Sequence, residues 1–305
     1  MKSAIALTIA VSLLVTFGAN RPASADAAGS GNPSLQIMNE FQEHSLGATF
    51  GRDADEQEGT KSADAGWLRG MDISYWQGDA AHIGWKFATE RGATFTYVKV
   101  SEGSYGGIAT RYAQQREAAR SRGLYTGPYH FANPNRSYAS GADQARLFAG
   151  YSKEWHTTGN PLWAPGEKSL PPMVDLEWNP YPEDGDDCYD RTPAEMVAWI
   201  HDFVDTASEL FGRAPVIYTS ASWWSLCTGN SPDFGDNPLS LAYWTADKAA
   251  GPAEIPVGWT AWTFWQHGND DTVYTPAGEL LPGDQQFFNS TAIGDLESFA
   301  NSGPK

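Results

Sequence analysis

Two carboxylates stand two positions apart in the segment 171–179, which reads Pro-Pro-Met-Val-Asp-Leu-Glu-Trp-Asn. The proline pair and the apolar residues predict a short buried strand, and alternation along a strand places Asp175 and Glu177 on one face. Two carboxylates in unequal environments, one protonated and one ionised, are typical of glycosidic bond hydrolysis. An exposed edge strand with solvated acids is the alternative, so the surrounding elements have to decide between the two.

Strands and helices alternate along the first half of the chain. The predicted strands cover 70–76, 93–100 and 124–131, and the predicted helices cover 83–91, 109–122 and 140–151. Alternation at this spacing indicates parallel strands joined by right-handed crossovers. The strand that carries Asp175 is then the fourth of the series.

The clearest helix follows at residues 193–211. Thr192 and Glu195 form a capping-box pattern around Pro193, an apolar stripe of period 3.6 continues to Phe211, and Gly212 is a stop signal. A fifth strand is predicted at 215–219.

Beyond residue 238 the pattern changes. Strands are predicted at 239–245, 260–267 and 284–288, without a full helix between the first two. The predicted fold class is therefore α/β, a modified TIM-like barrel with about five β/α units and a closing all-strand portion. Closure of the barrel is not predicted either way.

Active sites of β/α barrels lie at the carboxyl ends of the strands, so polar and aromatic residues there are the candidates. Acids and rings recur at these strand ends, and many of them could bind or cleave a sugar. The candidate residues are Asp72, Lys99, Glu102, Tyr129, Asp175, Glu177, Tyr218, Trp244, Trp265 and Asp284.

Other chemistries find little support. The six histidines lack the His-Glu-x-x-His spacing, and there is no Gly-x-Ser-x-Gly elbow or phosphate-binding glycine loop. We predict no metal and no cofactor, with a Mg²⁺ or Ca²⁺ site among the carboxylates as a minor alternative. His130 is predicted to be a core histidine rather than a base. The net charge of -17 argues against a nucleic-acid partner.

The N-terminus predicts export. Lys2, an apolar run over 4–17 and Ala-Ser-Ala at 23–25 form a signal peptide of residues 1–25, and no other run reaches membrane length. Residues 26–66 are predicted to be a polar leader or linker, or a removed pro-segment, and 67–302 to be the barrel domain. In an oxidising compartment the only two cysteines, Cys188 and Cys227, are expected to pair.

Seven blocks, taken in order, resemble the family 25 glycoside hydrolases, lysozymes of the muramidase type. The blocks lie at 70–78, 97–103, 127–132, 172–177, 216–219, 262–266 and 284–289. Two positions depart from the family pattern, namely Tyr75 where His is common and Asp-Gln-Gln at 284–286 in place of Asp-x-Asn.

The resemblance implies a secreted barrel enzyme, expected to be monomeric, that cleaves the β-1,4 bond between N-acetylmuramic acid and N-acetylglucosamine in bacterial peptidoglycan. It implies Glu177 as general acid, Asp175 as nucleophile or as the partner of the substrate acetamido group, and Asp72 and Asp284 as the rest of the acidic floor. Glu102 belongs to the family signature and ranks below these. A carbohydrate-binding barrel without catalysis remains the alternative.

Overall fold

The computed structural model describes residue 46 and residues 65–81, 83–104, 109–152, 166–245, 248–249, 251–268 and 282–302. All of them belong to one compact unit, Gly31–Lys305. The predicted signal peptide lies outside the described residues, as does the predicted leader up to residue 64, apart from Leu46.

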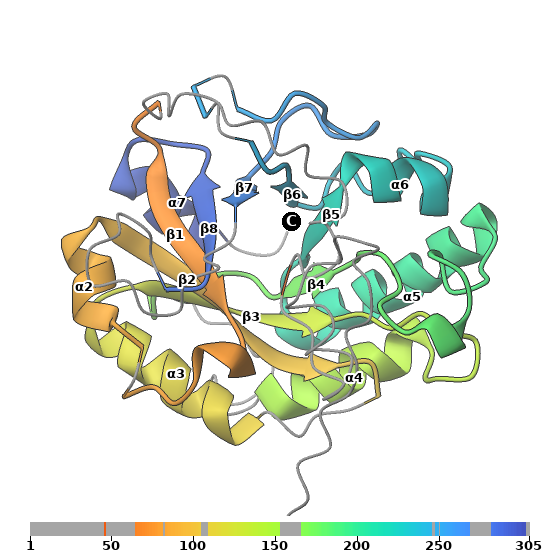
Figure 1. Cartoon of the computed structure of the whole chain (residues 1–305), viewed down its shortest axis with the longest axis horizontal. Helices are drawn as coiled ribbons and strands as arrows, with labels where there is room; N and C mark the ends of the chain where they lie inside the picture. Colours follow the sequence, from red (N-terminus) through yellow and green to blue (C-terminus); the bar gives the residue numbers. More distant parts are fainter. Residues whose placement is uncertain are drawn as a thin grey trace, which may run out of the picture. The chain divides into compact units, whose positions relative to one another are not determined.

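Eight strands form a closed barrel in chain order (Figure 1). They are β1 (Leu68–Ile73), β2 (Ala93–Glu102), β3 (Tyr125–Phe131), β4 (Met173–Asp175), β5 (Val216–Ser220), β6 (Leu239–Ala242), β7 (Phe264–Gly268) and β8 (Asp284–Phe288). Neighbours from β1 to β7 are parallel, whereas β8 is antiparallel to both β7 and β1. The predicted α/β barrel with an all-strand closing portion is confirmed, and the barrel closes.

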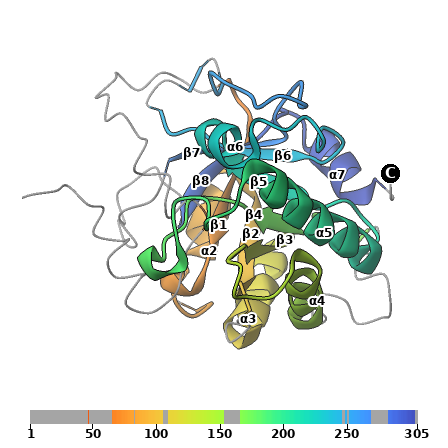
Figure 2. The same ribbon diagram turned by 90° about the vertical axis from the view of Figure 1, so that its right-hand side faces the viewer.

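Six α-helices accompany the strands in the described part of the chain. They are α2 (Trp85–Glu90), α3 (Ala109–Ser121), α4 (Gly141–Tyr151), α5 (Pro193–Phe211), α6 (Ala221–Thr228) and α7 (Ile293–Asn301). In two views at right angles, α3, α4 and α5 lie outside the strands (Figures 1 and 2). Among these described residues, no helix is long and apolar enough to cross a membrane.

Helix α5 has the ends that its sequence predicts. The Thr192 side chain accepts a hydrogen bond from the Glu195 N–H, the Glu195 carboxylate accepts one from the Thr192 N–H at 2.9 Å, and Gly212 has a φ of 72°. Met196, Ile200 and Phe203 face the core, because they belong to the apolar stripe. The helix thus covers one wall of the barrel near the strand that carries Asp175.

Four predicted strands were several residues too long at one end or both, namely the first, the fourth, the sixth (239–245, observed Leu239–Ala242) and the seventh (260–267, observed Phe264–Gly268). The first ends at Ile73, because the Ser74 side chain caps a short 3₁₀ turn at Tyr75–Gln77. The fourth covers only Met173–Asp175, so Glu177 lies two residues past its end. The Leu176 N–H still donates to the Tyr218 carbonyl at 2.9 Å, which continues the parallel pairing with β5 and fixes the chain beneath Glu177.

Helices α6 and α7 were not predicted. Helix α6 has only eight residues and is rich in tryptophan and serine, so its sequence carries no clear 3.6-residue period. Its first turn depends on a local contact, since the Ser220 hydroxyl accepts from the Trp223 N–H at 3.1 Å. A capping serine is a common helix start signal, but it is weak without a periodic apolar stripe behind it.

The core includes one residue from the predicted leader. Leu46 has an exposed fraction of 0% and belongs to the apolar cluster of the barrel. Leu46 thus packs in the barrel core although it belongs to the predicted leader.

Candidate active site

Asp72 lies at the centre of a hydrogen-bonded acidic cluster. Its exposed fraction is 1%, and its Oδ2 atom accepts from the Gln286 Nε2 atom at 2.6 Å and from the Gln266 Nε2 atom at 3.0 Å. Among the described residues, no group donates to Asp72 Oδ1. Burial raises the pKa of Asp72 to about 7 against the lowering effect of both amides, and the nearby Glu177 carboxyl adds to the rise.

Gln266 connects this carboxyl to the aromatic candidates. Its Oε1 atom accepts from the Tyr218 hydroxyl at 2.6 Å and from the Trp244 indole N–H at 2.9 Å. The amide is thereby oriented so that its Nε2 atom faces Asp72 and lies 3.5 Å from Asp284 Oδ2. The structure therefore brings together four predicted residues through one glutamine.

Asp284 reaches this cluster because β8 runs antiparallel to β1. Asp72 and Asp284 are direct partners in the strand register. The preceding Gly283 has a φ of 86°, and a Cβ atom there would lie 2.1 Å from the Asp72 carbonyl oxygen. Only glycine allows this close approach, which places the start of β8 against the end of β1.

Asp175 and Glu177 are both buried, with exposed fractions of 0% and 2%. Apart from the Glu177 carboxyl, no group among the described residues hydrogen bonds to the Asp175 oxygens. Burial raises the pKa of Asp175, and the Glu177 carboxyl raises it further by its charge and by a hydrogen bond, whereas the Lys99 ammonium opposes the rise. The two carboxyls therefore share a hydrogen bond, which requires one of them to carry a proton.

Glu102 has a different environment. It is the last residue of β2, and its carboxylate forms an ion pair with Lys99 and accepts a hydrogen bond from the Tyr181 hydroxyl. Both oxygens are thus engaged, and the side chain is 4% exposed. The ion pair and the hydrogen bond hold the Glu102 side chain in place.

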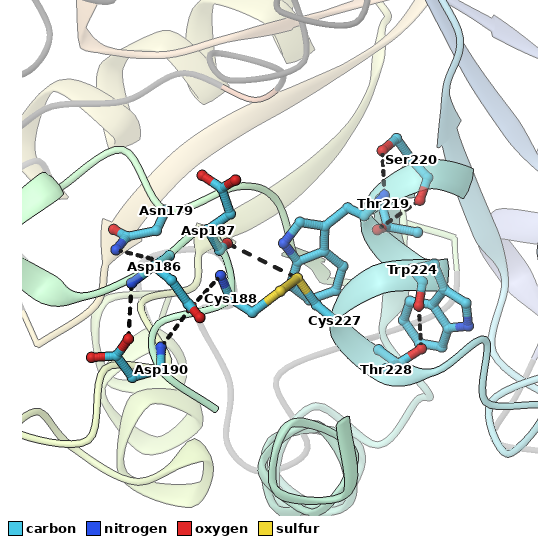
Figure 3. Close-up of a disulfide and its surroundings, with 11 residues drawn as sticks. Asn179, Asp186, Asp187, Cys188, Asp190, Thr219, Ser220, Trp224, Cys227 and Thr228 are labelled. Carbon is cyan, nitrogen blue, oxygen red and sulfur yellow. Dashed lines mark hydrogen bonds between the residues drawn. A yellow bond between two sulfur atoms is a disulfide. The ribbon is translucent and has the colours of Figure 1, made fainter. Parts of the chain in front are cut away.

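The predicted disulfide between Cys188 and Cys227 is present, with the two Cα atoms 5.4 Å apart (Figure 3). It joins the segment after β4 to helix α6. The Cys188 N–H and the Asp190 N–H both donate to Asp186 Oδ1, at 2.9 and 2.8 Å, so the loop that carries Cys188 is a tight turn.

This turn supplies Tyr189, which sequence reasoning missed. Tyr189 has a φ of 59° and is 1% exposed, and its hydroxyl has no hydrogen-bond partner in the described part of the chain. Burial raises its pKa, and the charges of Glu177 and Glu102 add to the rise. Its position directly after a bonded cysteine was the only signal in the sequence.

Tyr129 completes the site on the β3 side. The ring is buried, and its hydroxyl accepts from the Leu46 N–H at 3.2 Å. Burial raises the pKa of Tyr129, with further contributions from Asp72, Asp175 and Asp284. The Tyr129 hydroxyl thus faces the carboxylate cluster.

Trp265 is not brought to the site. It is 0% exposed, its ring packs edge-on against Trp67 and Trp262, and its indole N–H donates to the Tyr243 carbonyl at 2.7 Å. Neighbouring strand residues point to opposite faces, so Gln266 faces the acids and Trp265 faces away. Trp265 was a candidate from the sequence, whereas the residue of this pair that contacts the acids is Gln266.

His130 is a core residue, as predicted. Its Nε2 atom donates to Gln144 Oε1 at 3.1 Å, and its Nδ1 atom accepts from the Ser101 hydroxyl at 2.8 Å. Burial lowers its pKa to about 4, so the ring is neutral at physiological pH. His130 thus stabilises the contact of β3 with α4 and is not a catalytic base.

Gln286 and Tyr181 were also missed. Gln286 is two residues after Asp284 in β8 and therefore shares its face, which was a usable signal. Tyr181 comes from the irregular segment after β4, where no periodicity predicts direction. No group of three or more histidine, cysteine, aspartate or glutamate side chains within the described ranges is arranged to hold a metal ion.

The assembled site contains a proton-sharing carboxyl pair, a second buried carboxyl held by two amides, and hydroxyl and indole groups around them. Such an arrangement can protonate a leaving oxygen and stabilise positive charge at an adjacent carbon, as glycosidic bond cleavage requires.

Comparisons with known proteins agree with this chemistry. Residues 71–275 match the family model of the glycosyl hydrolases family 25. Lysozyme M1 of Streptomyces globisporus is 33% identical over 235 residues, which cover 75% of this chain and 70% of that protein. An N,O-diacetylmuramidase of Chalaropsis sp is 34% identical over 232 residues, which cover 74% of this chain and 100% of that protein.

Solved structures give the same result. A family GH25 lysozyme from Aspergillus fumigatus has a TM-score of 0.64 at 34% identity, covering 77% of this chain and 99% of its own. A bacterial lysozyme from Streptomyces coelicolor has a TM-score of 0.65 at 33% identity, covering 78% of this chain and 99% of its own. Because the family model spans more than half of the sequence, the chain belongs to the glycosyl hydrolases of family 25, and it is a glycoside hydrolase.

Proposed function

We propose that this protein is a secreted N-acetylmuramidase that hydrolyses the β-1,4 bond between N-acetylmuramic acid and N-acetylglucosamine in bacterial peptidoglycan. The single observation that carries the proposal is the buried, coupled pair of Asp175 and Glu177 at the end of β4. The relatives' names support the substrate class, since they are a lysozyme and two N,O-diacetylmuramidases.

In the proposed reaction Glu177 is the general acid. The two carboxyls share a hydrogen bond, so one of them carries a proton. In the proposed reaction Glu177 passes this proton to the leaving glycosidic oxygen. Asp175 provides negative charge opposite the anomeric carbon, as nucleophile or as partner of the substrate acetamido group.

Asp72 and Asp284 form the floor of the proposed substrate site. Tyr129, Tyr218 and Trp244 provide hydroxyl, indole and ring contacts for the sugar, and Lys99 and Glu102 support the floor from β2. Trp265 is not part of the proposed site, because its ring packs against Trp67 and Trp262 and its indole N–H donates to the Tyr243 carbonyl.

The proposed chain organisation is a signal peptide of residues 1–25, a leader of residues 26–66 and a catalytic barrel of residues 67–302. The extracellular location follows from the signal pattern at the N-terminus. We further propose a monomer without a nucleic-acid or membrane partner, since the net charge is -17.

The test is the digestion of purified bacterial walls. Hydrolysis is expected to clear the suspension and to release fragments whose new reducing ends are N-acetylmuramic acid, identified by borohydride reduction and mass spectrometry. Tight wall binding without new reducing ends would favour the carbohydrate-binding alternative, and N-acetylglucosamine ends would contradict the proposed bond.

A further inference from the structure

Leu46 makes two main-chain hydrogen bonds inside the proposed active site. Its N–H donates to the Tyr129 hydroxyl at 3.2 Å, and its carbonyl accepts from the Gln266 Nε2 atom at 3.1 Å. Its side chain is fully buried. This residue lies before the predicted start of the barrel domain at residue 67, in a stretch that the sequence predicts to be a leader.

Both partners of Leu46 belong to the acidic cluster. The Gln266 Nε2 atom that binds the Leu46 carbonyl also donates to Asp72 Oδ2 at 3.0 Å and lies 3.5 Å from Asp284 Oδ2. The Tyr129 hydroxyl lies within the electrostatic reach of Asp72 and Asp175. Leu46 therefore binds the same tyrosine and glutamine that adjoin the carboxyl cluster.

The site binds Leu46 through contacts that suit a segment of peptide main chain. A hydroxyl accepts the N–H, a carboxamide donates to the carbonyl, and an apolar surface takes the side chain. A bound sugar would need the same hydroxyl and amide, so the leader and the substrate compete for them.

We propose that Leu46 is an internal ligand of the catalytic site and holds the uncleaved chain in a latent form, which proteolysis of the leader releases. This inference rests on the proposed muramidase function of the same site. Arg52 and Lys61 lie between Leu46 and the barrel, so a trypsin-like protease has two possible cleavage positions there. Cleavage converts an intramolecular ligand into a separate peptide, which loses its high effective concentration.

The first test compares activities of full-length chains on soluble peptidoglycan fragments. In Leu46→Asp a carboxylate replaces the buried side chain beside Asp72 and Asp284, which disfavours docking of the leader. We expect release of reducing ends to rise by about tenfold or more, the factor that corresponds to losing one buried leucine contact. The matched control is Leu226→Asp, because Leu226 lies on α6 with 58% of its surface exposed and is expected to leave the rate unchanged.

The second test does not depend on activity. The Leu46 amide hydrogen of the wild-type chain is expected to exchange slowly, and N-acetylchitotetraose, a soluble oligosaccharide, is expected to accelerate its exchange by competing for the site. Because it uses the wild-type chain, this measurement tests the inference even if Leu46→Asp fails to fold.

Three results would overturn the inference: free exchange of the Leu46 amide, exchange that the sugar does not accelerate, or a folded Leu46→Asp chain no more active than wild type. If wild-type, variant and trypsin-treated chains all release no reducing ends from walls, the proposed function fails. Hydrogen exchange then still shows whether Leu46 occupies the site.

Discussion

At the scale of single residues, the site depends on carboxyl groups kept away from water. Asp72 is buried, accepts two amide hydrogen bonds and still has a pKa raised to about 7. Desolvation therefore outweighs the two hydrogen bonds at this position. The energetic cost of burying these acids is a property of the folded state, so it appears in the dependence of stability on pH.

The raised pKa of Asp72 predicts that stability falls as pH increases from about 4 to about 7. In this range the folded chain retains a proton on Asp72 that the unfolded chain releases, so the folded state loses relative stability. Asp72→Asn removes this titration while keeping an oxygen that accepts from Gln266 and Gln286.

Urea unfolding at the two pH values measures the effect. Between about pH 4 and about pH 7 the wild-type chain is expected to lose unfolding free energy, and Asp72→Asn is expected to lose less. An equal loss in both proteins would show that other groups control the pH dependence.

At the scale of elements, the loops after β4 and β5 position the residues around the carboxyl pair. The Cys188–Cys227 disulfide joins the loop after β4 to helix α6 across a sequence separation of 39 residues, and Tyr189 beside it is buried within the electrostatic reach of Glu177 and Glu102. The strands position the acidic residues in the barrel, and the disulfide-linked segments contribute the residues beside them.

Replacing both Cys188 and Cys227 by serine is expected to lower the unfolding free energy by about 3–4 kcal/mol, because the unfolded chain regains the freedom of a long loop. Guanidinium unfolding of the double variant under non-reducing conditions gives the value. Adding reductant to the wild-type chain should produce a similar loss, and an unchanged midpoint in both cases would contradict a stabilising role.

Thr192→Ala is expected to destabilise the chain by about 1 kcal/mol, since it removes the acceptor for the Glu195 N–H at the start of α5. Thr206→Ala is the matched control, because Thr206 lies inside the same helix, where alanine has the higher helix propensity. Thermal unfolding of both variants compares them. A loss as large in Thr206→Ala would mean that the cap is not the cause.

Elements with a strong hydrophobic period could be predicted from the sequence. Elements that depend on tertiary contacts could not. Helix α5 was predicted with both caps, and the strand order followed from the alternation of strands and helices. Helix α6 was missed, and β4 was drawn too long, because short elements carry too few residues for a period to be read. Trp265 was taken as a candidate because tryptophan often binds sugars, whereas alternation along β7 turns Gln266 toward the acids and Trp265 away from them.

At the scale of the whole molecule, barrel closure explains why distant residues meet. Asp72 and Asp284 are more than two hundred residues apart in sequence, yet they are direct partners because β8 runs antiparallel beside β1. The sequence indicated that both are candidates, but it could not show the closure that joins them. Nor could it show that Leu46 enters the same site, since a single apolar residue in a polar stretch has no pattern.

The central claim is that Glu177 is the general acid and Asp175 the charged partner. It is tested most directly by the rates of Glu177→Gln and Asp175→Asn on walls and on an aryl β-glycoside whose leaving group needs no proton, each compared with wild type in the same form of the chain. Glu177→Gln is expected to lose about 10²–10⁴ in rate on walls and to recover most of it on the aryl substrate. Asp175→Asn is expected to lose activity on both substrates. Recovery of Asp175→Asn, or near-full activity of Glu177→Gln on walls, would contradict the assignment and make Glu102 the next candidate.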